Sequence, residues 1–389
     1  MYLTKSEERT LEGEYGWSNQ TAMKILVKLG DLFGATKLIP VQSAHLSGVS
    51  YKHLGDAAIE FLNELAENGG TAKMLTTLNP SSFDSQYLVK RYSKERFSKQ
   101  QRIIQLYKQM SIQPTLTCTP YYIQNPKAGQ HLAWAESSAV VYANSVLKAW
   151  TNREGSPSAL AAALIGKTPN YGVHQPEKRK PDVLVKVEAQ LETEMHYGVL
   201  GILLGKLLKE KIPAFKALRP GSDDKLKQLG AAMASSGMTA LFYTSAVGKK
   251  QKLETISIEA TDIKQAAASL CTTNDAPDLV FVGCPHCSIM ELKTLANLLR
   301  RRKVRRDVEL WVCTSQHVKD KARKYVEVVE RSGGHVLCDT CVLVSWIKDL
   351  GIETLMTNSA KTAYYAPTLN EVNVVLKPLK HCIETACRG

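Results

Sequence analysis

Short apolar runs alternate with amphipathic stretches along this chain, and the alternation is most regular in its last third. Residues 279–282 and 308–312 are apolar runs of strand length that each lead into a helix, and residues 335–341 end a third run before another helix. A fourth run, residues 354–357, ends at a polar segment. Apolar runs that alternate with helices are typical of parallel strands covered on both faces. The pattern therefore predicts a doubly wound α/β domain over residues 266–389.

The first two thirds of the chain show the same rhythm less regularly. Residues 37–41 predict a short buried strand, which runs into a loop at residues 45–51 whose Gly and Ser could present backbone amides to an anion. A second strand near residues 73–75 leads into a polar turn at residues 76–80. In α/β proteins the ligand-binding groups lie in loops at the carboxyl ends of strands. We therefore assign residues 1–265 to α/β domains that carry a substrate pocket.

Other segments of this region have weaker patterns. Helices are expected over residues 6–36, 56–67, 91–110 and 196–208, strand-rich segments over residues 181–191 and 240–260, and a short strand that ends at Cys118. Cys118 stands just before Pro120 in the sequence Thr-Cys-Thr-Pro.

The stretch from Trp134 to His174 is unusually rich in polar residues that lie among small and apolar ones. The polar positions are Ser137, Ser138, Asn144, Ser145, Thr151, Asn152, Arg153 and Glu154. Buried polar groups must find hydrogen-bond partners in the protein, in water or in a ligand. A structural network would explain any one of them, but their density predicts a polar ligand pocket.

Composition and charge describe an ordinary globular protein with a basic excess. The 389 residues are 44% hydrophobic and 22% charged, which is enough for two or three domains with a sizeable core. The formal net charge is +13, yet the positive residues are scattered apart from Arg300–Lys303 and Arg305–Arg306. That run follows an amphipathic helix, so we interpret it as a solvated helix end. The balance suits a small anionic substrate or an acidic partner better than nucleic acid.

The start of the chain and its thiols indicate a cytoplasmic protein. Met1 is soon followed by charged residues rather than by a secretory leader, and no run approaches the roughly 18 apolar residues of a membrane span. Nine cysteines, an odd number, point to a reducing compartment and to thiols kept for metal or redox chemistry. We expect no membrane association.

The cysteines allow more than one chemistry. Cys271, Cys382 and Cys387 are expected to be buried small hydrophobes. Loops with Cys284, Cys313, Cys341 and Lys361 should share one edge of the predicted sheet. The Cys284-x2-Cys287 and Cys338-x2-Cys341 pairs could bind zinc, but about 50 residues separate them whereas zinc ribbons use roughly 15–20. A redox Cys-x-x-Cys and an iron–sulfur cluster held by separate loops remain open.

A set of short blocks gives the chain a family resemblance. The blocks are Gly13-Glu14-Tyr15-Gly16, Gly48-Val49-Ser50-Tyr51-Lys52, Thr76-Thr77-Leu78-Asn79-Pro80, Glu136-Ser137-Ser138-Ala139-Val140-Val141-Tyr142-Ala143-Asn144-Ser145, Thr151-Asn152-Arg153-Glu154-Gly155, Gly283-Cys284-Pro285-His286 and Asp339-Thr340-Cys341. Together, and in this order over nearly the whole length, they resemble aconitase X, and within it the archaeal branch that acts on phosphomevalonate.

The resemblance implies a fold, a reaction and a partner. The fold would be an aconitase-like α/β body of parallel and mixed sheets flanked by helices, with a [4Fe–4S] cluster between domains. The reaction would be the dehydration of (R)-5-phosphomevalonate to trans-anhydromevalonate 5-phosphate in the archaeal mevalonate route to isoprenoids. In this branch a separate small subunit forms a heterodimer with the large one, carries the swivelling domain, and is thought to supply a serine as the base.

The resemblance also implies roles for individual residues. The cluster ligands would be Cys118, Cys284 and Cys341, with Cys287 as the alternative to Cys118. The substrate would bind Gly48, Val49, Ser50, Asn79, Pro80, Glu136, Ser137 and Lys361, and the catalytic residues would be Glu136, Ser137 and Arg153. Lys361 or Arg153 could hold the phosphate, although Arg153 could equally form a salt bridge with Glu154 or Glu136.

Two alternative functions stay open. The hydroxyproline dehydratase branch of aconitase X uses the same scaffold on an amino acid, and a zinc-stabilised nucleic-acid-binding protein would use the net charge and the paired cysteines. The second alternative assigns no role to residues 134–174. His45, His174 and His286 are candidates for proton transfer or for a structural role.

Overall fold

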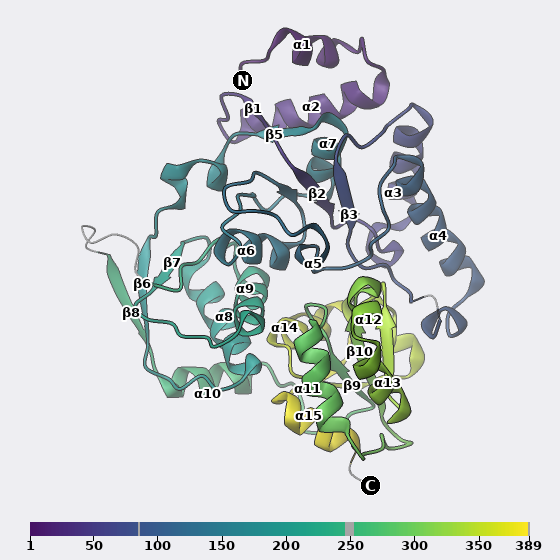
Figure 1. Ribbon diagram of the computed structural model, residues 1–389, viewed down its shortest axis with the longest axis vertical. Coiled ribbons are helices and arrows are strands. Elements are labelled where there is room, and N and C mark those ends of the chain that lie inside the picture. The colour runs from purple at the N-terminus through teal and green to yellow at the C-terminus, as the bar shows by residue number, and fades with distance from the viewer. Residues whose placement is uncertain (85, 246–252, 388–389) are drawn as a thin grey trace. The chain divides into compact units, whose positions relative to one another are not determined.

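The computed structural model describes residues 1–84, 86–245 and 253–387 (Figure 1). The chain divides into two compact units. Unit 1 comprises Met1–Ser82 and Tyr92–Lys180, and unit 2 comprises Phe83–Arg91 and Pro181–Gly389. Within the described residues, no helix is both long and apolar enough to cross a membrane. The boundary expected at residue 265 stays a prediction.

Unit 1 is built around a three-stranded parallel sheet with the strand order β3-β2-β4. Its strands are β1 (Leu38–Pro40), β2 (Ser43–Leu46), β3 (Leu75–Leu78), β4 (Ala133–Trp134) and β5 (Lys167–Pro169). Its helices are α1 (Lys5–Glu12), α2 (Trp17–Leu32), α3 (Tyr51–Glu67), α4 (Lys94–Gln109), α5 (Tyr121–Gln124), α6 (Ser137–Ser145) and α7 (Ser156–Ile165), with 3-10 turns at Gly172–His174 and Pro176–Arg179. Strands β1 and β5 form a separate antiparallel pair.

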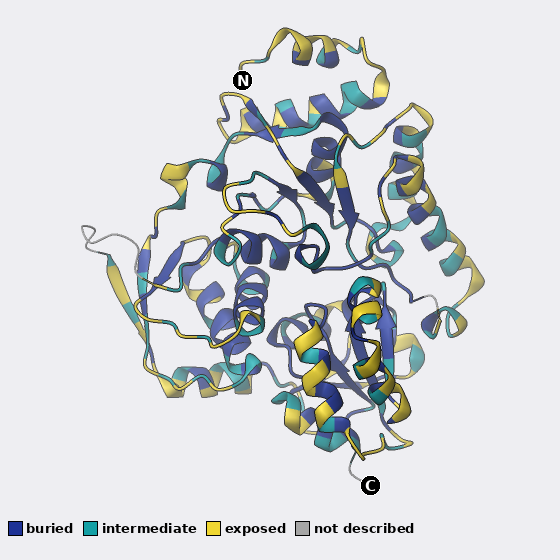
Figure 2. Cartoon of the chain, in the orientation of Figure 1, coloured by how far each residue is buried: buried dark blue, intermediate teal, exposed yellow. Residues whose placement is uncertain are grey.

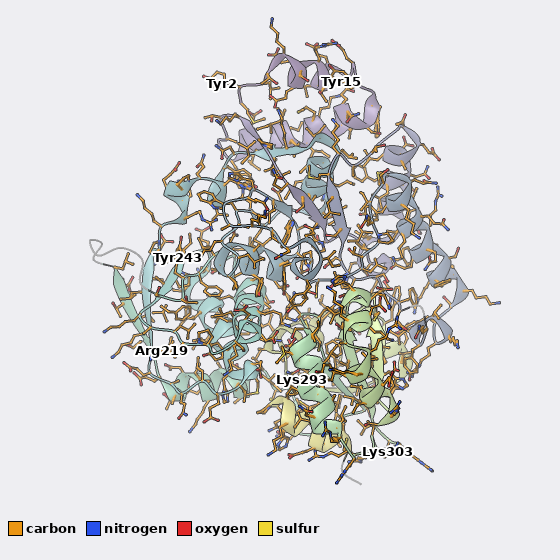
Figure 3. All side chains as sticks on the ribbon, in the orientation of Figure 1. Tyr2, Tyr15, Arg219, Tyr243, Lys293 and Lys303 are labelled. Atoms are coloured by element: carbon orange, nitrogen blue, oxygen red, sulfur yellow. The ribbon has the colours of Figure 1, made fainter. Side chains whose placement is uncertain are left out.

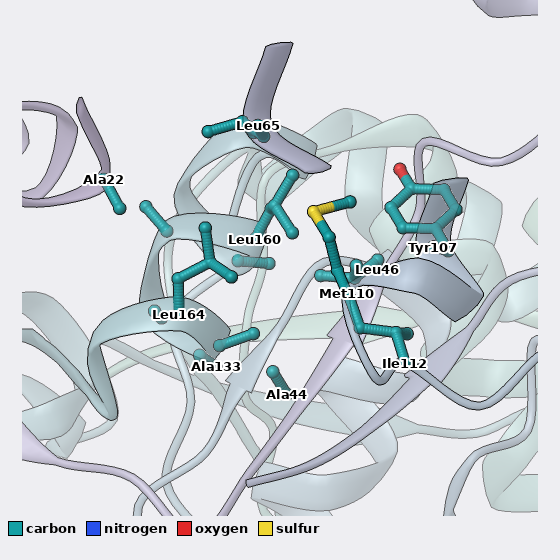
Figure 4. Close-up of a cluster of buried hydrophobic side chains, with 14 of the residues drawn as sticks. Ala22, Ala44, Leu46, Leu65, Tyr107, Met110, Ile112, Ala133, Leu160 and Leu164 are labelled. Atoms are coloured by element: carbon teal, nitrogen blue, oxygen red, sulfur yellow. The ribbon is translucent and has the colours of Figure 1, made fainter. Parts of the chain in front are cut away.

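The core of unit 1 lies between the sheet and its helices (Figure 4). Helix α7 is buried from Ser158 to Ile165 because it carries Ala and Leu on all sides. Leu160 and Leu164 of this helix join Ala22 of α2 and Leu65 of α3 in one apolar cluster. The small side chains of α7 let it pack closely against both α2 and β2.

The expected strands of unit 1 are only partly correct. Residues 45–51 were expected to be a loop, but His45 belongs to the central strand β2, and the loop begins after Leu46. Residues 76–78 were expected to be a turn, but they form most of β3, since buried Thr76 and Thr77 suit a strand. The strand expected at Cys118 is replaced by an irregular segment that makes one parallel bridge, between Gln113 and β3.

The expected helices of unit 1 form with shifted ends. The stretch at residues 6–36 divides into α1 and α2, because Gly13 and Gly16 adopt positive φ angles of 97° and 88° between them. Helix α3 begins at Tyr51, five residues before the expected start, and contains a kink at Gly55. Helix α4 matches the helix expected over residues 91–110.

Unit 2 contains two parallel sheets. Its strands are β6 (Val183–Val187), β7 (Pro213–Phe215), β8 (Glu254–Ile258), β9 (Leu279–Val282), β10 (Glu309–Thr314), β11 (His335–Cys338), β12 (Thr354–Thr357) and β13 (Asn373–Leu376). Its helices are α8 (Glu194–Leu208), α9 (Asp223–Ser236), α10 (Ala260–Ser269), α11 (Ile289–Leu299), α12 (Gln316–Lys321), α13 (Arg323–Arg331), α14 (Ala360–Leu369) and α15 (Leu379–Cys387), with 3-10 turns at Leu88–Lys90, Val342–Val344 and Ile347–Leu350.

The larger sheet has the order β11-β10-β9-β12-β13, and every pair in it is parallel. This order confirms the doubly wound α/β fold that the apolar runs predict. The strand order reverses direction between β9 and β12, and ligands of such folds bind beside that point at the carboxyl ends of the strands. Figure 2 shows helix α11 with one exposed and one buried face, as expected for a helix that covers a sheet.

The smaller sheet has the order β7-β6-β8, and the helices α8 and α9 of the same segment pack against each other. Helices α8 and α9 approach closely at Gly201, where a Cβ atom would lie 2.5 Å from the Leu229 carbonyl oxygen. Strands β6 and β8 lie in the segments expected to be strand-rich, and residues 246–252 of that expectation lie outside the described residues.

The basic run after α11 is solvent-exposed. Arg300 is the C-terminal cap of α11, and the three residues that follow it are exposed as well. Lys303, labelled in Figure 3, donates a hydrogen bond of 2.6 Å to the Arg331 carbonyl. This arrangement is the solvated helix end that the sequence indicates.

Candidate functional site

The substrate residues expected in unit 1 come together at one edge of its sheet. Gly48, Val49 and Ser50 follow β2, Asn79 and Pro80 follow β3, and Glu136 and Ser137 follow β4. The three strands end in register, because the Asn79 amide donates to the Leu46 carbonyl at 2.9 Å and the Ala135 amide donates to the His45 carbonyl at 2.8 Å. The parallel strands therefore place all seven residues at the carboxyl edge of one sheet.

Cys118 lies at the same edge of unit 1. The preceding Thr117 donates its amide to the Leu78 carbonyl, at the end of β3, over 2.8 Å. The cysteine is 7% exposed and forms no disulfide. A backbone contact to β3, rather than a regular strand, therefore places this thiol beside the substrate loops.

Hydrogen bonds fix the carboxylate of Glu136 at this edge. Asn79 Nδ2 donates to Glu136 Oε2 at 3.0 Å, and Ser138 Oγ donates to Glu136 Oε1 at 2.8 Å. Glu136 also caps helix α6, since its carboxylate accepts from the Ser138 amide. The residue is buried at 8% exposure, and each of its two carboxylate oxygens accepts a hydrogen bond.

His45 lies behind Asn79 and extends this chain of hydrogen bonds into the core. Its Nε2 lies 3.4 Å from Asn79 Oδ1, and its Nδ1 lies 2.8 Å from Thr77 Oγ1. Gln124 Nε2 in turn donates to Thr77 Oγ1 at 2.6 Å. Because Asn79 donates through its nitrogen to Glu136, its oxygen is left to accept a proton from His45 Nε2, which assigns the tautomer.

Burial keeps His45 neutral. The ring is fully buried, and burial lowers its pKa to about 4, with the nearby Glu136 charge opposing the shift. A neutral imidazole can donate from Nε2 and accept at Nδ1 at the same time. His45 therefore orients Asn79, and through it Glu136, in the geometry of this unit.

Gln100 of helix α4 fixes the loop that contains Gly48, Val49 and Ser50. Its Oε1 accepts from the Tyr51 amide at 2.9 Å and from the Ser82 amide at 3.1 Å, and its Nε2 donates to the Val49 carbonyl at 2.9 Å. The side chain is fully buried. Sequence analysis missed it, because a glutamine in a polar amphipathic helix looks like a solvated residue.

The polar stretch of residues 137–154 is held mainly by the protein itself. Asn144 and Thr151 exchange two hydrogen bonds, of 2.8 and 3.0 Å. Asn152 donates to the Tyr171 carbonyl and accepts from the Val173 amide, both at 3.0 Å. These bonds are the structural network that was the alternative to a ligand pocket. Ser137, Ser145 and Arg153 are half-buried, and the other five members are buried.

Glu154 is a buried carboxyl group held by two hydroxyl donors. Ser158 Oγ donates at 2.6 Å and Thr168 Oγ1 donates at 3.0 Å. Burial raises the pKa of Glu154, and these two hydroxyls oppose the rise. The partners found for Glu154 are thus hydroxyls, and not the Arg153 guanidinium that one interpretation of the sequence paired with it.

Arg179 is a second organising residue that sequence analysis missed. Its guanidinium donates to the Asn144 Oδ1 and the Val173 carbonyl at 3.1 Å, and it lies over the Trp150 ring at 4.5 Å. Arg179 therefore joins the hydrogen-bond network that contains Asn144. His174 joins the same region, with its Nδ1 2.9 Å from that of His131.

In unit 2 the expected cysteines lie at the carboxyl edge of the larger sheet. Cys284 follows β9, and Cys341 follows β11. They are 3% and 7% exposed and form no disulfide. Lys361 lies in the first turn of α14 after β12 and is buried at 8% exposure. The loops with Cys284 and Lys361 therefore flank the position where the strand order reverses.

The other cysteines of this edge support the loop of Cys284. The Cys287 amide donates to the Cys313 carbonyl at 2.9 Å, and Thr314 Oγ1 donates to the Cys287 carbonyl at 2.8 Å. Gly283 has a φ of 110°, and a Cβ atom there would lie 2.2 Å from the Cys313 carbonyl oxygen. Only glycine fits this approach of the loop to β10. Burial raises the pKa of Cys338, within β11, to about 12.

The cysteines expected to hold a cluster are buried and form no disulfide, and thiolates suit an iron–sulfur cluster as well as zinc. Of the two Cys-x-x-Cys pairs, Cys338 lies in strand β11 and the Cys287 amide donates to the Cys313 carbonyl. Among the described residues, no group of three His, Cys, Asp or Glu side chains has a metal-binding arrangement. Cys118 belongs to unit 1, whereas Cys284 and Cys341 share unit 2.

Comparison with protein families gives a match along almost the entire chain. Residues 1–177 match the family model described as the aconitase X first domain, residues 181–268 match the second domain, and residues 277–388 match the third. The motif resemblance is thereby confirmed.

Individual relatives agree with this match. The chain is 46% identical over 404 residues to the phosphomevalonate dehydratase large subunit of Methanocaldococcus jannaschii, covering 99% of this chain and 100% of that one. It is 32% identical over 408 residues to the cis-3-hydroxy-L-proline dehydratase of Pseudomonas aeruginosa, covering 100% of this chain and 70% of that one. The crystal structure of Thermococcus kodakaraensis aconitase X in its holo-form has a TM-score of 0.93 at 44% identity, covering 99% and 100% of the two chains.

Proposed function

This chain belongs to the aconitase X family, and on that premise we propose that it is the large subunit of a phosphomevalonate dehydratase. The enzyme is a hydro-lyase that removes water from (R)-5-phosphomevalonate to give trans-anhydromevalonate 5-phosphate, a step of the archaeal mevalonate route to isoprenoids. Identity supports this substrate over hydroxyproline, since five large subunits of the dehydratase are 35–46% identical to this chain and the two hydroxyproline enzymes are 31–32% identical.

The observation that carries the proposal is the convergence of three loops at the carboxyl edge of the β3-β2-β4 sheet. A substrate with a carboxylate, a hydroxyl and a phosphate needs anion-binding backbone and a fixed polar set. The loop after β2 leads directly into helix α3, whose amino end carries a partial positive charge. We assign Gly48, Val49, Ser50, Asn79, Pro80, Glu136, Ser137 and Lys361 to substrate binding.

Glu136, Ser137 and Arg153 are assigned to catalysis. The reaction breaks a C–H bond next to the carboxylate and a C–O bond to the hydroxyl, so one proton and one hydroxide leave as water. The carboxylate of Glu136, which Asn79 and Ser138 hold in place, suits a role that orients the substrate hydroxyl as it leaves. The guanidinium of Arg153 supplies a positive charge that can hold an anionic group of the substrate.

The proposed cofactor is a [4Fe–4S] cluster held by Cys118, Cys284 and Cys341. When bound through three thiolates, such a cluster supplies an iron with an open position that acts as a Lewis acid toward the leaving hydroxyl. Support comes from three buried cysteines that form no disulfide, two of which lie in loops after parallel strands, and from the aconitase relationship.

The proposed partner is a separate small subunit in the cytoplasm. The alignments cover 95–100% of the length of the relatives named large subunits, whereas they cover only 69–70% of the hydroxyproline dehydratases. In this proposal the second chain carries the swivelling domain and the serine base that the family resemblance implies. No nucleic acid or membrane is part of this assembly.

The test is to reconstitute the chain anaerobically with iron and sulfide, add the small subunit from the same genome, and follow phosphomevalonate by ³¹P and ¹H NMR. The expected result is an alkene proton signal that grows as phosphomevalonate is consumed, and only when both subunits are present. Turnover of cis-3-hydroxy-L-proline instead would contradict the proposal.

A further inference from the structure

Lys227 of helix α9 is a buried cation close to one of the proposed cluster ligands. Its side chain is 1% exposed. Its Nζ contacts Glu291 Oε2, lies 3.3 Å from Asp224 Oδ1, and donates at 3.2 Å to the carbonyl of His286. His286 is two residues after Cys284. The ammonium therefore fixes the backbone of the Cys284 loop directly.

The two carboxylates tie the same loop to the start of helix α11. Glu291 accepts from the Ser288 amide at 2.8 Å, and Ser288 Oγ donates to Asp224 Oδ2 at 3.0 Å. Burial raises the pKa of Glu291, and the Lys227 charge opposes the rise. Buried ion networks add little net stability, because desolvation offsets the attraction between their charges. This network is therefore better explained by its positioning of the Cys284 loop than by a contribution to the free energy of unfolding.

His286 connects the Cys284 loop to the Cys341 loop. The side chain is fully buried, and its Nε2 lies 2.9 Å from the carbonyl oxygen of Thr340. A carbonyl only accepts, so Nε2 carries the proton. Thr340 immediately precedes Cys341. One imidazole thus spans from the loop after β9 to the loop after β11, across the width of β10.

Hydrogen bonds from buried side chains also fix the backbone around Cys341. Ser345 Oγ donates to the Cys341 carbonyl at 3.1 Å and lies 3.1 Å from Thr340 Oγ1. Asn370 Nδ2 donates to the Ser345 carbonyl at 3.0 Å. The backbone on both sides of His286 is therefore fixed by buried side chains.

We infer that His286 and Lys227 are positioning residues that hold the Cys284 and Cys341 loops together, so that both thiols are available to one iron–sulfur cluster. The inference rests on the proposed function, which takes these two cysteines as cluster ligands. Groups that orient metal ligands from outside the coordination shell typically change metal affinity by about 10–100-fold when they are removed. The imidazole and the ammonium act through the loop backbone rather than on the substrate.

The test compares cluster loss among variants in the complex with the small subunit. His286→Leu removes the hydrogen bond to Thr340, and His286→Gln places an amide N–H where Nε2–H was. His335→Leu is the matched control, because this half-buried histidine begins β11, at the opposite end from Cys341. After anaerobic reconstitution, iron and sulfide per chain are counted, and the decay of the absorbance near 400 nm is followed after a chelator is added.

The expected result is that the cluster of His286→Leu decays at least about tenfold faster than that of the wild type, whereas His286→Gln and His335→Leu decay at close to the wild-type rate. Lys227→Met should also accelerate decay. Ser345→Ala, a one-atom change that a folded chain tolerates, should accelerate it by less. Circular dichroism of the apoproteins shows that the variants are folded.

A His286→Leu or Ser345→Ala complex that keeps its cluster as long as the wild type would overturn the inference and leave the proposed function intact. A wild-type complex that binds no iron after reconstitution would overturn the proposed function itself, and the inference with it. The two failures are therefore distinguishable from the iron count of the wild type.

Discussion

The two sheet edges that hold the candidate residues use the same topology for different chemistry. Both lie at the carboxyl ends of parallel strands, β3-β2-β4 in unit 1 and β11-β10-β9-β12-β13 in unit 2. The edge of unit 1 is oxygen- and nitrogen-rich, and its side chains hold one another through a chain from Gln124 to Glu136. The edge of unit 2 presents thiols, which are weak hydrogen-bond partners and are positioned through backbone contacts instead.

This difference shows how each edge should respond to mutation. A polar edge that orients an anionic substrate loses catalysis when one hydrogen bond is changed, but it keeps its fold. A thiol edge that binds a soft metal loses the cofactor altogether when one ligand is removed. The following predictions test that contrast in order of expected size.

The largest effect is expected from Cys284→Ser. Removing one thiolate should prevent stable cluster binding and reduce turnover by about 10³-fold or more, because the Lewis acid is lost. Iron counts and NMR turnover measure both effects. Cys271→Ser is the control, since this half-buried cysteine lies after α10 and is expected to keep iron and activity. Normal iron content in Cys284→Ser would remove Cys284 from the ligand set.

A smaller catalytic effect is expected from Glu136→Gln. The substitution keeps the shape of the side chain but removes its charge, and it places an amide nitrogen against Asn79 Nδ2 or Ser138 Oγ, which are both donors. We expect kcat to fall by about 10²-fold while the iron content stays at the wild-type level. Exposed Glu8, changed to Gln, should be neutral. An unchanged kcat would exclude Glu136 from catalysis.

Gln100→Leu tests the loop of unit 1 without touching a residue assigned to the substrate. The change leaves the Tyr51 and Ser82 amides without their acceptor, which costs about 1–3 kcal/mol for such buried groups. Part of that loss should appear as a rise in KM of about tenfold with little change in kcat. Gln105→Leu, on the same helix, is the control because it is exposed. An equal KM in both variants would contradict the role of Gln100.

The pH dependence of unit 1 should reveal His45. Its folded-state pKa is lowered from 6.5 to about 4, so the unfolded chain binds the proton first as the pH falls. The contribution of the neutral His45 ring to the free energy of unfolding is fully present above pH 6.5. It declines as the pH falls to about 4, and the loss is about 2 kcal/mol at pH 5. His174, whose pKa burial lowers to about 3, acts in the same direction.

Hydrogen exchange of the β2 amides at pH 7 and pH 5, corrected for intrinsic exchange rates, measures this loss. The variant His45→Gln should show a smaller difference between the two pH values than the wild type. Equal differences in the two proteins would show that His45 does not titrate as its burial requires.

The sequence predicts the two edges unequally well. Strands β9 and β12 were predicted with correct ends because β9 is apolar throughout and β12 has an apolar centre between two threonines, and both are fully buried. Strand β2 was missed because it carries Ser43 and His45, two buried polar residues that resemble a loop. The polar residues of the site therefore hide, in the sequence, the apolar pattern by which the strand that positions them would be recognised.

The supporting residues had no signal in the sequence at all. Gln100 and Lys227 lie in helices that also carry exposed polar residues, and only tertiary packing buries these two. The motif blocks nevertheless located the loops after β2, β3, β4 and β9, because each block contains or closely follows the carboxyl end of a strand. What sequence could not supply was the set of contacts between elements distant in the chain.

The most direct test of the account is an iron, sulfide and zinc count on the anaerobically purified complex, with its visible spectrum recorded on the same sample. The account predicts about four irons and four sulfides per large subunit, a broad absorbance near 400 nm, and no stoichiometric zinc. A colourless complex that stays colourless after reconstitution and holds one tightly bound zinc would contradict it.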